Sequence, residues 1–172
     1  LSEYQTLLTG ASNGWKLEYY PGGENHDIGG VVLLLRFEGE NVTIMSDKSV
    51  KGMDDPDSIR AGEQVTSKFS LLADQSTVLS FSTYNSLIHY WSEPKGVLDA
   101  DGYEGDFEFV ITAATQNDIT LKGKKHGAVM HMIRIADNAD WNTYISNCNL
   151  IRNESAEYAT LVGFRNGSTV IP

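Results

Sequence analysis

Residues 14–20, Gly-Trp-Lys-Leu-Glu-Tyr-Tyr, mark the point at which the hydrophobic pattern of the chain changes from helical to extended. Before this stretch, apolar side chains recur at the helical spacing i, i+3, i+4 and i+7, which predicts a helix over residues 3–11. Within it, apolar and charged residues alternate, as in a strand with one buried face. We therefore predict that Trp15, at the start of this strand, is buried at one end of the fold.

The same alternation recurs in short segments separated by turn residues such as Gly, Asn and Asp. The predicted strands cover residues 15–19, 31–37, 42–45, 65–71, 78–81, 107–111, 119–121 and 129–135. Short links between consecutive strands favour antiparallel pairing. The sequence thus predicts a mainly β fold, an eight-stranded antiparallel meander. Closing it into a lipocalin-like (calycin-like) barrel would remove its exposed edges.

Two further helices are predicted, over residues 84–91 and 140–148, because apolar residues there share one helical face. We assign residues 1–150 to the barrel domain. Residues 151–172 form either an extra strand, over 158–164, or the start of a following segment. The chain begins at Leu1 rather than Met, so we expect it to be a processed product.

Composition excludes several classes of protein. The 172 residues include 13 Lys and Arg against 23 Asp and Glu, a formal charge of −10, and 41% of them are hydrophobic. These proportions are those of a folded domain rather than a disordered chain. The acidic balance argues against a nucleic-acid partner, because binding phosphates requires a cationic face. A single cysteine, Cys148, excludes a disulfide framework within the chain.

Two resemblances add to this interpretation. The Gly14-Trp15 pair after a helix is similar to the first-strand signature of lipocalin-like barrels. Ordered blocks in the middle of the chain resemble a family of secreted Bacteroidetes lipoproteins of unknown function. These blocks are LSFSTYN at 79–85, GDFEF at 105–109 and ITLKGKK at 119–125.

The second resemblance covers roughly residues 4–135 and implies an exported bacterial protein at the outer membrane or cell surface. Its lipid anchor, on a cysteine in front of Leu1, would be its only link to the membrane. Proteins of this kind accompany outer-membrane nutrient-uptake systems, which are the expected partners. The family has no established catalytic residues, so the resemblance assigns none here.

Local motifs for metal, cofactor or nucleophilic chemistry are absent from the sequence, so we expect no metal site, no cofactor and no catalytic residues. The four histidines lack zinc-type spacing, and no Gly-x-Ser-x-Gly is present. We expect His131 to be a core residue, since it alternates with Val129 and Ile133, and Cys148 to be buried. The polar loops at 47–62 and 99–106 are functional, mobile or solvated.

The predicted ligand-binding site combines the aromatic segment at 84–91 with the acidic loop that follows it. Its residues are Tyr84, Asn85, His89, Tyr90, Trp91, Asp99 and Asp101. Tyrosine and tryptophan combine apolar rings with polar groups and are common in ligand sites. The alternative is that this segment plugs one end of the barrel through Tyr84, Leu87 and Trp91, and both roles are compatible.

Three functions fit these observations. The first is a non-catalytic ligand-binding or accessory surface lipoprotein whose ligand is a small molecule, a glycan or a peptide. The second is a hydrolase of glycans or peptides that uses carboxylates of the two acidic loops. The third is a structural module of a larger surface assembly. A hollow barrel favours the first, facing carboxylates the second, and a filled barrel with an exposed apolar patch the third.

Overall fold

The computed structural model describes the backbone of residues 1–95, 102–162, 164–166 and 169–171, and the side chains of residues 1–95 and 102–153. It divides into two compact units, Leu1–Ala139 and Asp140–Pro172. The first contains a nine-stranded sheet, and the second contains a helix and a small hairpin.

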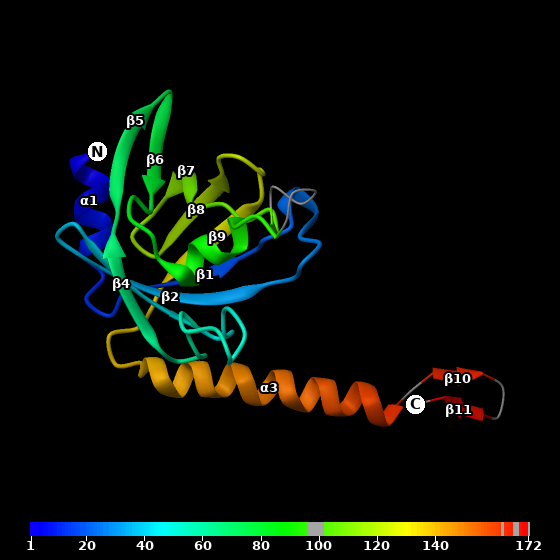
Figure 1. Cartoon of the computed structure of the whole chain (residues 1–172). Helices are drawn as coiled ribbons and strands as arrows, with labels where there is room; N and C mark the ends of the chain where they lie inside the picture. Colours follow the sequence, from blue (N-terminus) through cyan, green and yellow to red (C-terminus); the bar gives the residue numbers. More distant parts are fainter. Residues whose placement is uncertain (96–101, 163, 167–168, 172) are drawn as a thin grey trace. The chain divides into compact units, whose positions relative to one another are not determined.

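The first unit consists mostly of strands, with short helices before β1, between β1 and β2, and between β6 and β7 (Figure 1). In chain order they are α1 (Ser2–Thr9), β1 (Trp15–Tyr19), η1 (Gly23–Asn25), β2 (Val31–Glu38), β3 (Asn41–Ser46), β4 (Gln64–Lys68), β5 (Ser70–Asp74), β6 (Ser76–Ser80), α2 (Ser86–His89), η2 (Tyr90–Ser92), β7 (Glu108–Ala114), β8 (Asp118–Gly123) and β9 (Val129–Arg134). The strand order is β4-β3-β2-β1-β9-β8-β7-β6-β5, and every pair is antiparallel. The predicted mainly β, antiparallel fold is confirmed.

The first and last strands of the meander pair with each other, which nearly closes the sheet into a barrel. Trp15 of β1 lies opposite Leu35 of β2 on one side and Arg134 of β9 on the other. The remaining gap lies between β4 and β5, which follow one another in the chain. Two hydrogen bonds lie near this gap: Lys68 N donates to Thr83 Oγ1 at 2.8 Å, and Thr83 N donates to Lys68 O at 3.5 Å.

The strand predicted over 65–71 is two strands, so the count is nine rather than eight. The break falls at Phe69, where the chain leaves its pairing with β3 and begins to pair with β6. The Phe69 amide donates instead to Glu40 O at 3.1 Å, and its ring packs edge-on against Phe37 at 4.8 Å between centroids. Alternation continues through the break, so a period of two could not reveal it.

The interior of the barrel is filled with side chains. Buried residues of both halves of the sheet form one continuous cluster that includes Trp15, Leu17, Tyr19, Leu33, Leu35, Phe37, Phe81, Phe109, Leu121, Met130 and Met132. Phe109 makes edge-to-face contacts with Tyr19 at 6.3 Å and with Phe81 at 6.0 Å between centroids. A barrel of about eight strands is just wide enough for its own side chains, and aromatic rings occupy that width here.

The face of β9 that points into the barrel is the opposite of the one predicted. Met130 and Met132 are buried, whereas Val129, Ile133 and His131 lie on the outside. The expectation of a core His131 is therefore wrong. Its Nδ1 lies 3.1 Å from an Asp118 carboxylate oxygen on the neighbouring strand.

The second unit consists of α3 (Trp141–Val162) and a hairpin of β10 (Phe164–Asn166) and β11 (Thr169–Ile171). Asp140 begins the helix by accepting a hydrogen bond from Thr143 N at 2.8 Å. The helix is longer than the predicted 140–148, and residues 158–162 are helical rather than extended. Ala159 and Leu161 within this stretch, and Glu154 and Glu157 just before it, favour a helix. Cys148 is half-buried rather than buried.

Of the helices in the described part of the chain, none combines the length and the apolar character that crossing a membrane requires.

Candidate functional site

The segment that contains the predicted site begins at Asn85, whose side chain caps α2. Asn85 Oδ1 accepts a hydrogen bond from Leu87 N at 3.0 Å. Its Nδ2 donates to Val65 O at 3.2 Å and Ser67 Oγ at 3.1 Å, both on β4. Asn85 is completely buried. These internal bonds use its amide to fix the start of α2 against the sheet.

The inward face of α2 and η2 plugs one end of the barrel. Leu87 and Ile88 are fully buried and Trp91 is 6% exposed, and all three belong to the core cluster. Trp91 Nε1 donates to Leu87 O at 3.2 Å, and its ring lies 6.5 Å from that of Tyr19. The plug predicted for Leu87 and Trp91 is confirmed, but Tyr84 is not part of it, because 56% of Tyr84 is exposed.

Three aromatic side chains form a row outside this plug. The His89 ring lies 4.7 Å from that of Phe107 at an interplanar angle of 26°, and 5.3 Å from that of Tyr84. Burial lowers the pKa of His89 below its ordinary value, although the hydrogen bond with the Asn85 backbone acts in the opposite direction. Burial raises the pKa of Tyr84, and so does its hydrogen bond to the Glu93 carboxylate. Both side chains are therefore neutral at pH 7.

A pocket of about 350 Å³ lies beside this row, and we call it the Tyr90–Tyr103 pocket. It is lined by Lys51, Asp55, Tyr90, Glu93, Pro94, Lys95 and Tyr103. The two tyrosine rings are 5.7 Å apart, and burial together with their mutual hydrogen bond raises the pKa of Tyr90. The backbone holds Tyr103 in place, since its amide donates to Trp91 O at 2.9 Å.

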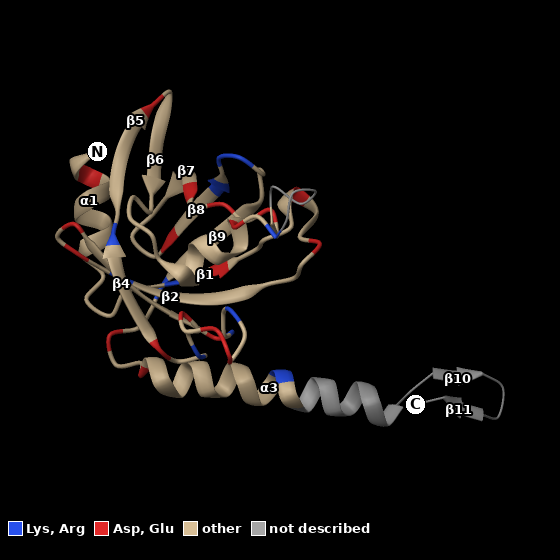
Figure 2. Cartoon of the chain, in the orientation of Figure 1, with Lys and Arg blue, Asp and Glu red and all other residues tan. Residues whose placement is uncertain are grey.

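The lining of this pocket is of mixed charge. It contains two lysines and two carboxylates, and Lys51 Nζ lies 3.6 Å from an Asp57 carboxylate oxygen just outside the lining. The predicted acidic residues Asp99 and Asp101 lie outside the described residues. Elsewhere in the unit, acidic segments are spread over loops and strand ends, while the turn between β8 and β9 is basic (Figure 2).

Asp106, from the loop predicted at 99–106, is a structural residue. It is 3% exposed, and its carboxylate accepts hydrogen bonds from Lys125 N at 2.8 Å and His126 N at 3.1 Å. A side chain at Gly123 would collide with this carboxylate, because an added Cβ would lie 2.1 Å from Asp106 Oδ2. The buried Asp106 thus fixes the conformation of the basic turn between β8 and β9.

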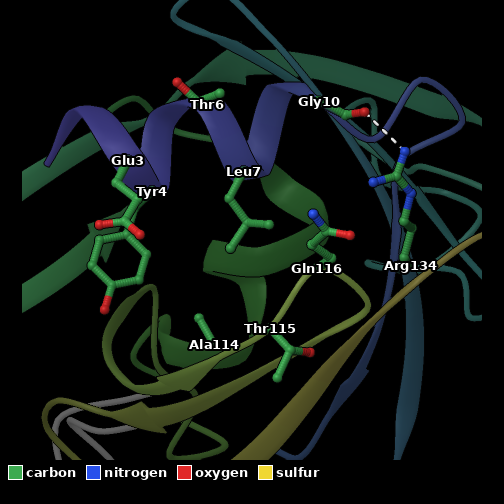
Figure 3. A pocket seen from close by; sticks show the side chains of 9 residues that line it. All are labelled: Glu3, Tyr4, Thr6, Leu7, Gly10, Ala114, Thr115, Gln116 and Arg134. Carbon is green, nitrogen blue, oxygen red and sulfur yellow. Dashed lines mark hydrogen bonds between the residues drawn. The ribbon is translucent and has the colours of Figure 1, made fainter.

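Two larger pockets, of about 760 and 660 Å³, flank α1. We call the larger one the α1 groove (Figure 3). Its lining consists of Glu3, Tyr4, Thr6, Leu7, Gly10, Ala114, Thr115, Gln116 and Arg134. The Arg134 guanidinium donates through Nη2 to Gly10 O at 2.9 Å, at the end of the helix.

Sequence reasoning missed most of these pocket residues. The length and polarity of the loop at 47–62 were the sequence signal for Lys51 and Asp55. In the structure, a bridge between Val50 and Ile59 closes this loop, and both residues line the Tyr90–Tyr103 pocket. No signal pointed to Arg134, which closes the α1 groove from a strand distant in sequence. In the described part of the chain, no group of three or more His, Cys, Asp or Glu side chains is placed to hold a metal ion.

Fold and pockets together define a class: a small antiparallel barrel domain with a packed interior and its pockets on the outside. Residues 1–167 match the sequence model of a family described as a domain of unknown function, DUF4302. The chain belongs to this family. No curated protein and no solved structure matches the chain.

Proposed function

We propose that the protein is a non-catalytic binding module that holds a neutral glycan on the outside of its barrel, in the Tyr90–Tyr103 pocket. The observation that carries this proposal is the contrast between a barrel filled by Trp15, Phe81 and Phe109 and an open pocket lined by two tyrosines. The hollow interior that would have favoured a ligand inside the barrel is not found, so the proposed ligand binds outside it.

The chemistry of the pocket supports a polyhydroxylated ligand. Its volume of about 350 Å³ lies in the lower part of the usual range for small-molecule sites, roughly 300–1,000 Å³. The Tyr90 ring can attract the weakly positive C–H groups of a sugar ring, whereas Lys95 Nζ already lies 2.5 Å from the centre of the Tyr103 ring. Lys51 and Glu93 supply hydrogen-bond donors and acceptors for hydroxyl groups. The mixed charge favours a neutral ligand over an ion, because neither sign dominates the lining.

The cellular setting in this proposal rests on the sequence blocks at 79–85, 105–109 and 119–125, which resemble exported Bacteroidetes lipoproteins. We place the protein at the outer membrane or cell surface, held by a lipid anchor. There it would capture glycans for an outer-membrane uptake system. A lipocalin-like origin of the barrel is supported by the Gly14-Trp15 pair and by the antiparallel meander.

A glycan array followed by titration calorimetry tests the proposal. We expect a neutral oligosaccharide to bind, and we expect Tyr90→Ala and Tyr103→Ala to weaken binding at least tenfold, since stacked aromatics dominate small binding sites. Tyr144→Ala is the matched control, because Tyr144 is also half-buried but does not line the pocket. Binding that survives both pocket variants would contradict the proposed site.

The same samples separate the two alternatives. Release of shorter sugars from a bound glycan, measured by chromatography, would replace the proposal with the hydrolase that uses carboxylates of the acidic loops, such as Asp55. The absence of any glycan binding would favour the structural module, because a filled barrel is also what such a module requires.

A further inference from the structure

We propose that the α1 groove binds a short peptide with free termini, about three residues long, with its amino group at Glu3 and its carboxylate at Arg134. This site shares no residue with the Tyr90–Tyr103 pocket and does not depend on the proposed function. The proposal rests on charge complementarity between the two ends of the groove and the two termini of a peptide.

Among the described residues, Glu3 and Arg134 are the two charged ones that line the α1 groove. Figure 3 shows them at opposite ends, with Glu3 on the first turn of α1 and Arg134 beside Gly10. Within the described residues, neither is in an ion pair with another side chain. The bond to Gly10 O uses one of the five N–H donors of the guanidinium and fixes its position, and the others can bind a carboxylate as a fork.

The separation of the two charges sets the length of the peptide. From Glu3 to Gly10 the helix rises about 10 Å, at about 1.5 Å per residue. An extended peptide covers about 3.3–3.6 Å per residue, so about three residues span this distance. A single amino acid would reach only one of the two charges.

The middle of the groove suits a peptide with an apolar central residue. Tyr4 and Leu7 point from α1 toward the turn between β7 and β8 (Figure 3). Ala114 lies on the far side, which gives an apolar contact on both walls. Thr115 and Gln116 add side-chain groups that can donate to and accept from a peptide backbone. The pocket volume of about 760 Å³ leaves room for a tripeptide.

Titration of the wild-type protein with the tripeptide Ala-Leu-Ala, its N-acetylated form and its C-amidated form tests both ends separately. Calorimetry gives the affinities, and amide NMR shifts of Gly10 and Gln116 locate the binding. We expect the free peptide to bind in the groove and each blocked end to weaken binding about two- to fivefold, as for a partly exposed ion pair. Equal affinity for all three peptides, or no binding at about 10 mM peptide, would overturn the proposal.

Two variants assign the ends. Glu3→Gln should weaken binding of the free peptide but leave that of the acetylated peptide unchanged. Arg134→Gln should weaken binding of the free peptide but leave that of the amidated peptide unchanged. Glu38→Gln and Lys48→Gln are matched controls that remove one charge outside the groove. If either groove variant weakened all three peptides equally, its charge would act only on the fold and the assignment would be wrong. The comparison of peptides on the wild-type protein holds even where a variant fails to fold.

Discussion

The indole Nε1 of Trp15 donates a hydrogen bond to the carbonyl oxygen of Leu8 at 3.0 Å, and both residues are completely buried. This bond joins the first strand of the barrel to the helix that precedes it. It also satisfies a carbonyl near the C-terminus of α1, where helical partners run out. The predicted burial of Trp15 is confirmed, and the bond to Leu8 explains how a polar N–H is accommodated there.

Replacing Trp15 should therefore be among the most damaging changes in the first unit. We expect Trp15→Ala to lower the free energy of unfolding by about 3–5 kcal/mol, because it leaves a cavity in the core. Trp15→Phe should cost less, since it keeps an apolar ring but leaves Leu8 O without its donor. Urea denaturation measures both. Leu72→Ala, at a 40% exposed position, is the control, and a Trp15→Ala protein as stable as this control would contradict the prediction.

The cap of α2 gives a second prediction. Asn85→Ala should lower the free energy of unfolding by about 2–4 kcal/mol, because it removes the helix cap and leaves Val65 O without a buried donor. Asn85→Ser should recover part of this loss, since a serine hydroxyl can still accept from Leu87 N. Thermal and urea unfolding compare the two. Equal losses in both variants would show that capping contributes nothing at this position.

Asp106 gives a third prediction. We expect Asp106→Ala to lower the free energy of unfolding by about 2–4 kcal/mol, because two backbone N–H groups of the β8–β9 turn lose a charged acceptor. Asp118→Ala, which removes an exposed carboxylate paired with His131, should cost less than about 1 kcal/mol. Amide hydrogen exchange at Lys125 and His126 provides a local check. Unchanged protection there in Asp106→Ala would contradict the assigned role.

The pKa of His89 gives a prediction for pH dependence. Burial lowers this pKa in the folded protein below the unfolded value of about 6.5, so folding favours the neutral ring. The resulting stability is fully present above pH 6.5 and is lost as the pH falls through the folded pKa. Between pH 7.5 and 5, the wild-type protein should therefore lose more stability than His89→Gln. Tyr84→Phe keeps all four histidines and should follow the wild type. Parallel stability curves for wild type and His89→Gln would refute this.

Local pattern alone determined much of the barrel. Alternation at Trp15, Leu17 and Tyr19 identified β1, and the tight turn between the strands at 31–37 and 42–45 identified a hairpin. The inward face of α2 and η2 also followed from helical spacing, because Leu87 and Trp91 are one turn apart. These features depend on residues close in sequence, so their periodicity contains the information.

Tertiary structure decided what periodicity leaves ambiguous. In β9 both alternating series contain apolar residues, so periodicity does not say which one is buried. Met132 faces inward because it pairs with Leu17 of β1 and Ile119 of β8, which are themselves buried. The break at Phe69 depends on which neighbouring strand the chain pairs with, and no local pattern records that choice.

The pockets were likewise beyond the reach of the sequence alone. Glu3 and Arg134 are far apart in the sequence but line the same groove, because β9 pairs with β1 beside the helix. The spacing of apolar residues and turns predicted the antiparallel sheet, which the structure nearly closes into a barrel. The polar side chains that lie together at the ends of the sheet were decided only by the tertiary structure, which placed distant strands side by side. Contacts between residues far apart in sequence produce no periodic pattern in the chain.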